Sequence, residues 1–571
     1  MQDSLGSTWA KIIIEQLIED QHDFFCISPG SRSTPLVLAI DANSQAKTFI
    51  HFDERSLAFH ALGYSKIALN APVVVVTSGT ACGNLLPAVM ESYESSTPLI
   101  ILTADRPFDL QDSGANQTTK HQLSLYKNFV CYELALPTPD ISYLENLRHL
   151  IHRASYLTKK HKKSVHINCC FKEPFNLDSS KTPKFFSSPC LSYLFEKKIP
   201  TETVQQIANC INQAKKGAFL LGADAAKHPE NSSLALLADL LQWPIFADPL
   251  ALWDSHACDI AHYNKIFKQL TSTSSELADL KFDCILHFGG SFVSKHLLNF
   301  LKNTQPTTYI HIHAFDQRFD PGHLVTHKLE IEPGVFAQAL LPFVQKPEKP
   351  SLWFALAEHI KNTIDHFFSK VQSNSEAYFF WKLSQTITCD SLFIGNSMPI
   401  RDLTDFFTKS SISTKIYCNR GLSGIDGNIA TAAGLCFAMQ KPLWAILGDQ
   451  TFLHDATSLA HLSALQNPLT LIILNNRGGQ IFSHLPIHHL GKTCEKYFIN
   501  PHSVHIQRIA QAFNIPYLFY KSVDQFFLGQ ENFHNTSCLI EIETSSTSNL
   551  EVHRLVSLEM EDALSAFVCK I

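Results

Sequence analysis

The chain has 571 residues, which is too long for one hydrophobic core, because chains divide into domains beyond roughly 250–300 residues. Hydrophobic residues make up 45% and charged residues 17% of the sequence, so the composition is globular and excludes long disordered regions. A net charge of −6 offers no basic surface to nucleic acid or to an anionic membrane.

The first predicted element is an amphipathic helix in residues 1–17, MQDSLGSTWAKIIIEQL. This segment lacks the basic region of a signal peptide, and no apolar run reaches the roughly 18 residues of a membrane span. The 15 cysteines are odd in number and form no C-x-x-C pair, which favours free thiols over disulfides or a zinc site. We therefore expect a cytoplasmic protein.

Short apolar runs of strand length alternate with helix-like segments along the rest of the chain. Leu57, Ala61, Tyr64 and Ala68, for example, recur on one face of a predicted helix. This alternation predicts an α/β fold of doubly wound parallel sheets, covered by helices on both faces. The predicted strands are DFFCIS, PVVVVTS, PLIILTA, GAFLLGA, FDCILHFGG, TTYIHIHA, SLFIGN, PLWAILG and LTLIILNN.

Two changes in composition mark domain boundaries. Residues 175–190 are rich in Ser, Pro and Lys, and residues 344–351 read VQKPEKPS; both stretches are typical of linkers. They divide the chain into three predicted α/β domains, at about 1–180, 190–345 and 355–571.

An internal similarity connects the first and last of these domains. VVVVTSGT is followed by a helical stretch and PLIILTADRP, and LWAILGDQT by a helical stretch and PLTLIILNN. Gly79 precedes Pro98 by 19 residues, and Gly448 precedes Pro468 by 20. We interpret the two segments as versions of one βαβ unit, although βαβ units resemble one another in general.

Polar side chains follow two predicted neighbouring strands of the last domain. Asp449 offers a carboxylate, Asn476 an amide oxygen, and Gly478 a backbone carbonyl. Ligands of open α/β sheets bind beyond the carboxyl ends of the strands. A few oxygen donors suit Mg²⁺ shared with a diphosphate, because Mg²⁺ takes its other ligands from phosphates and water. Alternatively, Asp449 only caps a helix, and residues 475–479 form a plain turn.

The spacing of Gly-Asp and Asn-Asn resembles the motif of thiamine-diphosphate enzymes, which pair a pyrimidine-binding (PYR) domain with a diphosphate-binding (PP) domain. Within that superfamily, the sequence resembles the 2-succinyl-5-enolpyruvyl-6-hydroxy-3-cyclohexene-1-carboxylate (SEPHCHC) synthase family, also called the MenD family. The motifs are SPGSRSTPL (28–36), FDERSLAFHALG (52–63), TSGTACGNLLPAV (77–89), LTADRP (102–107), GANQT (114–118), GNSMPIRD (395–402), NRGLSGIDGNIATAAG (419–434), GDQTFLHD (448–455) and NNRGGQIFSHLP (475–486). The middle domain matches weakly.

The resemblance implies roles in cofactor binding. Glu54 matches the carboxylate that hydrogen-bonds the pyrimidine ring and promotes catalysis, and Ile425 matches the apolar wedge that bends the cofactor. Otherwise, Glu54 is an acid in the first turn of a helix and Ile425 a core residue. The implied ligands of Mg²⁺, or of Mn²⁺ in its place, are Asp449, Asn476 and Gly478. The implied cofactor-binding residues are Glu54, Gln117, Ser397, Met398, Ile425, Gly448, Asp449, Gln450, Thr451, Asn476 and Ile481.

The family also implies two anionic substrates, 2-oxoglutarate and isochorismate. Arginine binds carboxylates through paired hydrogen bonds, although surface salt bridges are its commoner role. The implied substrate-binding residues are Ser31, Arg32, Arg106, Gln117, Lys295, Ser397, Arg401, Arg420, Ile481, Phe482 and Leu485. The sequence departs from the family at His296, which follows Lys295 where a second permanently charged residue is usual.

The resemblance therefore implies a transferase of menaquinone (vitamin K2) biosynthesis. It would decarboxylate 2-oxoglutarate and add the succinyl unit to isochorismate in a Stetter-like 1,4-addition. The family further implies a homodimer with active sites between subunits, or a homotetramer of two such dimers. Three alternatives are another thiamine-diphosphate reaction, a non-catalytic binding protein, and a nucleotide-binding oxidoreductase; the last lacks a G-x-G-x-x-G motif after a strand.

Overall fold

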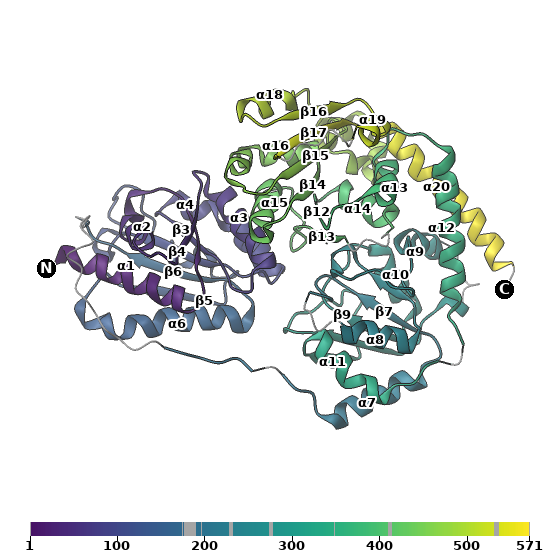
Figure 1. Ribbon diagram of the computed structural model, residues 1–571, viewed down its shortest axis with the longest axis horizontal. Coiled ribbons are helices and arrows are strands. Elements are labelled where there is room, and N and C mark those ends of the chain that lie inside the picture. Colours follow the sequence, from purple (N-terminus) through teal and green to yellow (C-terminus); the bar gives the residue numbers. More distant parts are fainter. Residues whose placement is uncertain are drawn as a thin grey trace.

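Three parallel β-sheets, each with helices packed against it, make up the chain (Figure 1). The computed structural model describes residues 2–173, 175, 190–195, 197–227, 232–272, 278–347, 349–408, 414–529 and 536–569. The predicted fold class is confirmed, and each of the nine predicted strands is present. No helix in these residues is long and apolar enough to cross a membrane.

The first domain contains a six-stranded sheet with the order β2-β1-β3-β4-β6-β5. Its central strands β3 and β4 are fully buried, because helices cover both faces of the sheet. The strands are β1 (Phe24–Ile27), β2 (Lys47–Ile50), β3 (Val73–Val76), β4 (Ile100–Asp105), β5 (Tyr132–Leu136) and β6 (Val165–Cys170). The helices are α1 (Gln2–Glu19), α2 (Thr34–Asp41), α3 (Glu54–Ile67), α4 (Thr80–Asn84), α5 (Leu86–Glu94) and α6 (Leu144–His161).

The middle domain contains a five-stranded sheet with the order β11-β10-β9-β7-β8. Its strands are β7 (Gly217–Leu221), β8 (Ile245–Ala247), β9 (Cys284–Phe288), β10 (Thr308–His313) and β11 (His327–Glu330). Its helices are α7 (Thr201–Gln213), α8 (Ser232–Leu241), α9 (Tyr263–Ser272), α10 (Lys295–Thr304) and α11 (Pro333–Leu340).

The last domain contains a six-stranded sheet with the order β13-β12-β14-β15-β17-β16. Its strands are β12 (Ser391–Ile394), β13 (Lys415–Tyr417), β14 (Leu443–Gly448), β15 (Leu469–Asn475), β16 (Tyr517–Tyr520) and β17 (Cys538–Glu543). The helices are α12 (Leu352–Lys370), α13 (Glu376–Thr386), α14 (Met398–Phe406), α15 (Asn428–Met439), α16 (Asp449–His454), α17 (Lys492–Cys494), α18 (Ile506–Ala512), α19 (Val523–Leu528) and α20 (Ser546–Val568).

The first and last sheets have the same topology. If the strands of each sheet are numbered along the chain, both sheets read 2-1-3-4-6-5. The two similar segments of the sequence occupy equivalent positions, because β3–β4 and β14–β15 are each the third and fourth strands of their sheets. The arrangement agrees with two versions of one unit.

The first and last domains pack directly through α3 and α15 (Figure 1). The helices approach so closely that glycine is required at both crossing points. A Cβ atom at Gly63 would lie 2.0 Å from the carbonyl oxygen of Thr431, and one at Gly434 would lie 1.9 Å from that of His60. The backbones of the two domains are therefore in contact.

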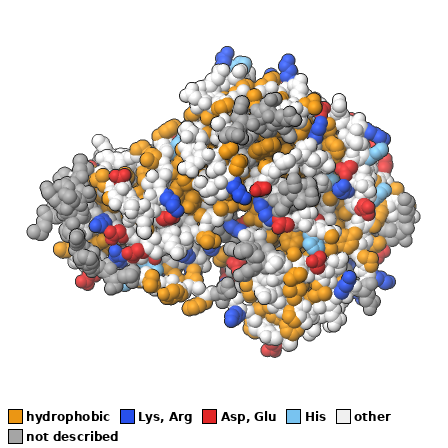
Figure 2. All heavy atoms as spheres, viewed as in Figure 1, with side chains coloured by type: hydrophobic (Ala, Val, Ile, Leu, Met, Phe, Trp, Pro, Cys, Tyr) orange, Lys and Arg blue, Asp and Glu red, His pale blue; other side chains and the backbone are white. Residues whose placement is uncertain are grey.

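The three sheets lie within residues 24–170, 217–330 and 391–543. Most of the first predicted linker lies outside the described residues, so the proposed boundaries stay a prediction. In the described part of the face drawn in Figure 2, basic and acidic side chains are interspersed and form no continuous basic area.

Candidate cofactor and metal site

Asp449 lies at the carboxyl edge of the last sheet, where α16 begins directly after β14. Its side chain is 2% exposed. One carboxylate oxygen, Oδ1, accepts a hydrogen bond from the backbone N–H of Gln450 (2.6 Å), and Oδ2 accepts one from that of Gly478 (2.8 Å). The fold thus brings Asp449 together with the loop that follows the neighbouring strand β15, as the strand order predicts.

Asn476 presents an unpaired oxygen in this loop. Its amide Nδ2 donates a hydrogen bond to Glu376 Oε1 (2.6 Å). Its carbonyl Oδ1 is buried and has no hydrogen-bond donor among the described residues. An unpaired buried carbonyl is energetically unfavourable. Its presence therefore fits the role of a cation ligand better than that of a side chain in a plain turn. The oxygen donors at Asp449, Asn476 and Gly478 fit Mg²⁺.

Gly478 is required by the close approach of another segment. A Cβ atom there would lie 2.8 Å from the carbonyl oxygen of Ile499. Gln450 Nε2 donates hydrogen bonds to the carbonyls of Ile499 (3.0 Å) and Asn500 (3.2 Å), and Gly479 N donates to Ile499 as well (2.7 Å). These bonds fold residues 499–500 against the candidate site. Among the other cofactor candidates here, Thr451 is buried, and a Cβ atom at Gly448 would meet open space.

Two residues near the site were not predicted from the sequence. His502 Nε2 lies 3.2 Å from Asp449 Oδ2, and interaction with this carboxylate raises the pKa of His502. Burial, together with the carboxyl groups of Asp402 and Asp449, raises the pKa of Glu376 to about 8. Nothing in the sequence around either residue indicated a contact with the Asp-to-Asn motif.

Glu54 lies in the first domain, at the start of α3. Asp53 caps the helix by accepting hydrogen bonds from the N–H groups of Arg55 and Ser56, so the first-turn position of Glu54 is confirmed. Glu54 Oε2 accepts a hydrogen bond from Asn84 Nδ2 (3.0 Å). Among the described residues, no hydrogen bond joins Glu54 to Asp449 or to the loop that follows β15. Within one chain, the carboxylates of Glu54 and Asp449 are therefore not directly connected.

The loop that carries Ile425 (residues 419–427) is held from two domains. Asn396, which follows β12, donates hydrogen bonds to the carbonyls of Asn419 (2.6 Å) and Gly424 (2.7 Å). From α5 of the first domain, Glu91 accepts hydrogen bonds from the N–H groups of Gly421 (2.8 Å) and Leu422 (2.6 Å). The Ile425 side chain is half-buried. Glu91 is a further residue that the sequence did not reveal.

The same loop carries Arg420, whose Nη1 donates a hydrogen bond to Asn396 Oδ1 (3.1 Å). Arg401 lies nearby on α14 and donates to the carbonyl of Ser397. Burial and the charge of Arg420 lower the pKa of Arg401. The structure therefore brings together Ser397, Met398, Arg401 and Arg420 of the predicted set.

Four predicted substrate residues lie at the carboxyl edge of the first sheet. Arg32 is 6% exposed, donates to the carbonyl of Phe171 (3.1 Å) and pairs with Glu173 (2.7 Å). Arg106 Nη1 donates to Ser78 Oγ and to the carbonyl of Gln117, both at 3.0 Å. The side chains of Ser31 and Gln117 are exposed. Burial lowers the pKa of Arg32, and the charge of Arg106 lowers it further.

The remaining predicted residues lie apart from these groups. Ile481 and Phe482 belong to the 3₁₀ helix η11 (Gln480–His484), and Leu485 follows it with 39% of its surface exposed. Lys295 begins α10 in the middle domain, where its side chain is exposed. Burial, with the charges of Lys295 and Lys268, lowers the pKa of the neighbouring His296 to about 4, so this histidine is neutral at pH 7.

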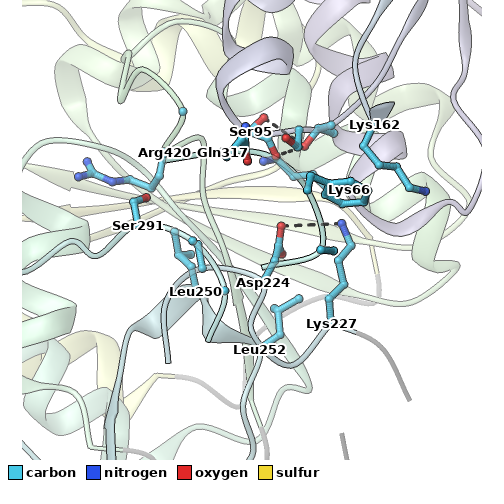
Figure 3. A pocket seen from close by; sticks show the side chains of 18 of the residues that line it. Lys66, Ser95, Lys162, Asp224, Lys227, Leu250, Leu252, Ser291, Gln317 and Arg420 are labelled. Carbon is cyan, nitrogen blue, oxygen red and sulfur yellow. Dashed lines mark hydrogen bonds and ion pairs between the residues drawn. The ribbon is translucent and has the colours of Figure 1, made fainter. Parts of the chain in front are cut away.

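A separate cavity of about 270 Å³ opens where the three domains meet (Figure 3). Lys162 and Lys227 lie on one side and Arg420 on the other. Lys227 pairs with Asp224 at 3.9 Å, and Lys66 donates a hydrogen bond to the carbonyl of Cys418 (3.1 Å). Of the predicted site residues, only Arg420 lines this cavity among the described residues.

Three family models match the chain in order along its length. They are described as the thiamine pyrophosphate enzyme N-terminal TPP binding domain (residues 7–125), the middle domain of thiamine pyrophosphate (188–394), and the thiamine pyrophosphate enzyme C-terminal TPP binding domain (402–533). The fold and these matches define a thiamine pyrophosphate enzyme. The prediction of thiamine diphosphate, the same cofactor, is confirmed, and no finding tests the metal.

Comparison with curated proteins identifies the family. The chain is 33% identical to the 2-succinyl-5-enolpyruvyl-6-hydroxy-3-cyclohexene-1-carboxylate synthase of Chlorobium phaeobacteroides (strain BS1), over 99% of both chains. It is also 33% identical to the protein of the same name from Chlorobaculum parvum (strain DSM 263 / NCIMB 8327), over 98% of this chain and 97% of that one. A third relative, protein PHYLLO of Arabidopsis thaliana, is 33% identical over 96% of this chain and 35% of its own length. The chain belongs to the 2-succinyl-5-enolpyruvyl-6-hydroxy-3-cyclohexene-1-carboxylate synthase family.

Proposed function

We propose that this chain catalyses the reaction for which its relatives are named. In that reaction, 2-oxoglutarate loses CO₂ and its succinyl unit adds to isochorismate, which places the enzyme in menaquinone biosynthesis. The observation that carries the proposal is the identity of 33% over 99% of the chain to a relative with this name. Similarity over the whole length favours a shared reaction over a shared fold alone, because the matched length includes the motifs assigned to the substrates as well as those assigned to the cofactor.

Asp449, Asn476 and the backbone at Gly478 would hold Mg²⁺, or Mn²⁺, together with the diphosphate. The buried and unpaired Oδ1 of Asn476 supports this assignment. Thiamine diphosphate, when bound, supplies the carbanion chemistry that decarboxylation and acyl transfer require. Thr451 and the α16 N-terminus would contact the phosphates through backbone N–H groups and the hydroxyl. Gln450 would act by holding residues 499–500, since its amide already donates to their carbonyls.

Glu54 would hold a proton at the pyrimidine ring of the cofactor. Its carboxylate is half-buried at a helix start and keeps one oxygen free of protein hydrogen-bond donors among the described residues. Ile425 would support the bent cofactor from the loop that Asn396 and Glu91 fix in place. An apolar wall would be formed by Ile481, Phe482 and Leu485. Phe482 packs against Phe498, with 5.4 Å between the ring centroids, and this contact would support the wall.

The substrate carboxylates would bind to arginines of the first and last domains. Arg106, Arg401 and Arg420 each hydrogen-bond to neutral oxygen atoms of the protein and form no salt bridge with a carboxylate of the described residues, so their charges are available to an anion. Arg32 would share its guanidinium with Glu173, with which it already pairs. Ser31, Gln117 and Ser397 would donate hydrogen bonds, and Lys295 would contribute from the middle domain.

We further propose a homodimer with active sites between subunits, in which Glu54 of one subunit faces the metal-binding loops of the other. Support comes from the absence of a hydrogen bond, in the described chain, between Glu54 and those loops, and from exposed apolar side chains near both. Phe52, two positions before Glu54, is 63% exposed, and Tyr497, two positions before Ile499, is 67% exposed. A homotetramer would pair two such dimers.

The 15 free cysteines favour the cytoplasm. The domains would span 1–180, 190–345 and 355–571.

A turnover assay with both substrates tests the reaction. Purified protein, thiamine diphosphate and Mg²⁺ should release CO₂ from 2-oxoglutarate and form one product whose mass equals isochorismate plus the succinyl unit. Decarboxylation without any isochorismate-derived product would favour another thiamine-diphosphate reaction, and absence of both would favour a binding protein.

Glu54→Gln tests the catalytic carboxylate. Loss of a positioned acid–base group should lower kcat by about 10²–10⁴-fold. Glu145→Gln is the matched control, because Glu145 is an exposed acid in the first turn of α6. Glu145→Gln should retain wild-type turnover. Equal turnover of Glu54→Gln and wild type would show that Glu54 is only a favourable helix residue.

A further inference from the structure

Two adjacent asparagines at the end of β15 each donate an amide hydrogen bond to a buried glutamate. Asn475 Nδ2 donates to Glu541 Oε1 (2.7 Å), and Asn476 Nδ2 donates to Glu376 Oε1 (2.6 Å). The exposed fractions of the two glutamates are 8% and 2%. The paired arrangement allows the two asparagines to be compared within one loop.

The carbonyl ends of the two amides differ. Asn475 Oδ1 accepts a hydrogen bond from the backbone N–H of Arg477 (3.0 Å), so that side chain is fully engaged by the protein. Asn476 Oδ1 is buried, yet no donor reaches it among the described residues. The carbonyl of Asn476 is therefore left available to a ligand that the polypeptide does not supply.

An asparagine that binds a cation must present the correct end of its amide. The oxygen and the NH₂ group have nearly the same size, so packing alone hardly distinguishes the two orientations. Only the oxygen can coordinate a metal ion. A neighbouring acceptor resolves the ambiguity, because it binds the NH₂ group and turns the oxygen the other way.

We propose that Glu376 is the positioning residue that directs the Asn476 oxygen toward the metal. The inference rests on the metal role assigned to Asn476 under the proposed function and adds to it the residue that makes this ligand competent. Partners that orient a ligating side chain typically contribute 10–100-fold to metal affinity. Glu376 touches Asn476 and acts through it.

The position of Glu376 is itself fixed by the start of α13. Ser375 caps this helix by accepting a hydrogen bond from the N–H of Tyr378 (3.2 Å). The N–H of Ala377 donates to Asn549 Oδ1 on α20 (3.1 Å). The carboxyl group thus reaches Asn476 from a rigid helix end, 100 positions earlier in the chain.

The test measures Mn²⁺ affinity of the full chain in the presence of thiamine diphosphate, by electron paramagnetic resonance of free Mn²⁺. Glu376→Met keeps the volume but removes the acceptor, and it should weaken Mn²⁺ binding about 10–100-fold. Glu376→Gln keeps an oxygen that can accept the same hydrogen bond, and it should bind Mn²⁺ within about threefold of wild type. This pair separates orientation from charge, since both variants lack the carboxylate.

Glu541→Met is the matched control. It removes the acceptor of Asn475, whose oxygen the protein already engages, and should leave Mn²⁺ affinity within about threefold of wild type. Circular dichroism and thermal melting establish that each variant is folded. Glu376→Ala replaces Glu376→Met if the latter does not fold, since the smaller side chain introduces no clash.

Wild-type Mn²⁺ affinity in Glu376→Met would overturn the inference. So would equal weakening in Glu376→Gln and Glu376→Met, which would assign the effect to charge. Asp449→Asn separates these results from the proposed function. If wild type binds Mn²⁺ and Asp449→Asn does not, the metal site stands whatever Glu376 does. If Asp449→Asn binds Mn²⁺ like wild type, the proposed metal site itself is wrong.

Discussion

Ser397 has a backbone conformation that glycine adopts more easily than any other residue. Its φ is 74° and its ψ −126°, directly before α14. Gly79 has nearly the same angles, 82° and −133°, before α4. A side chain in this region costs about 1–3 kcal/mol, and such strain tends to occur at functional sites. The strain at Ser397 agrees with its proposed contact with cofactor and substrate.

We expect Ser397→Gly to raise the thermal midpoint and weaken ligand binding. Relief of strain should exceed the added flexibility of glycine in the unfolded chain, about 0.5–1 kcal/mol. Ser397→Ala is the control, because it removes the hydroxyl but keeps the strained Cβ, and it should weaken binding without raising stability. Thermal melting and titration with thiamine diphosphate measure both effects. A lower midpoint for Ser397→Gly would contradict the strain argument.

Among individual site residues, those that lie in contiguous motifs could be predicted from the sequence. Asp449, Asn476 and Gly478 follow directly from two strand ends, and the fold brings them together. Glu376 and Glu91 could not be predicted, because they reach the site from 100 and 330 positions away. A buried glutamate in a helix has no local sequence signal that distinguishes it from an exposed one.

At the scale of elements, the loop of residues 419–427 depends on a helix of another domain. Glu91 on α5 accepts hydrogen bonds from two consecutive N–H groups of this loop. A glutamine there would offer one oxygen and one NH₂ group, and the latter would face an N–H. The loop that carries Arg420 and Ile425 would then lose a charged hydrogen bond of about 1.5–3 kcal/mol.

We therefore expect Glu91→Gln to raise the KM for 2-oxoglutarate and isochorismate at least about tenfold. Mn²⁺ affinity should change little, because Asp449 and Asn476 lie on other loops. Glu94→Gln, one turn further along α5 and exposed, should behave as wild type. Steady-state kinetics measure the effect, and an unchanged KM would show that Asn396 suffices to hold the loop.

The crossing of α3 and α15 has no room for a side chain. Gly434→Ala would place a Cβ atom 1.9 Å from the carbonyl oxygen of His60, so the helices must separate. We expect a loss of stability of at least about 1–3 kcal/mol, seen as a lower thermal midpoint. Gly83→Ala on α4 is the control, because its Cβ would meet no atom within 4 Å and should leave stability unchanged or slightly higher. Equal midpoints for the two variants would contradict the close packing.

The predicted strands contain apolar runs, such as VVVV of β3, although some of them also carry polar residues, such as His311 of β10. Strand β6 was missed because of its buried polar groups. In β6, His166 and Asn168 both hydrogen-bond to Thr103, which makes a buried strand appear polar in sequence. The edge strand β2 was missed for another reason, since three of its four residues are exposed. Composition alone therefore identifies neither strand.

At the scale of the whole molecule, buried histidines lie between the first and last domains. The Nδ1 atoms of His60 on α3 and His461 on the 3₁₀ helix η10 (Ala456–Ala464) are 3.2 Å apart. Phe49 stacks on His60, Phe437 also packs against His60, and the ring of His51 packs against that of His461. Burial, then the charge of His51, lowers the pKa of His60 to about 3. Burial and the same histidines lower the pKa of His461.

The folded state should therefore become less stable as the pH falls. Above pH 6.5 His60 is neutral in both states, so stability is unaffected. Between pH 6.5 and 3 the unfolded chain binds the proton and the folded chain does not, so the free energy of unfolding falls by about 1.4 kcal/mol per pH unit for this residue. His60→Phe should lose correspondingly less stability between pH 7.5 and 5.5, as measured by urea unfolding. His149→Gln, on an exposed face of α6, should follow the wild type; identical slopes in all three proteins would contradict the prediction.

The contact between α3 and the last domain has a consequence for synthesis of the chain. His60 and His461 lie 401 positions apart. A ribosome that adds about 5–20 residues per second needs roughly 20–80 s to travel between them. During that interval the face of α3 that carries Gly63, and its buried aromatic neighbours, have no partner to cover them. The nascent first domain must therefore remain free of aggregation with this face open, either shielded by a chaperone or incompletely folded, until α15 emerges.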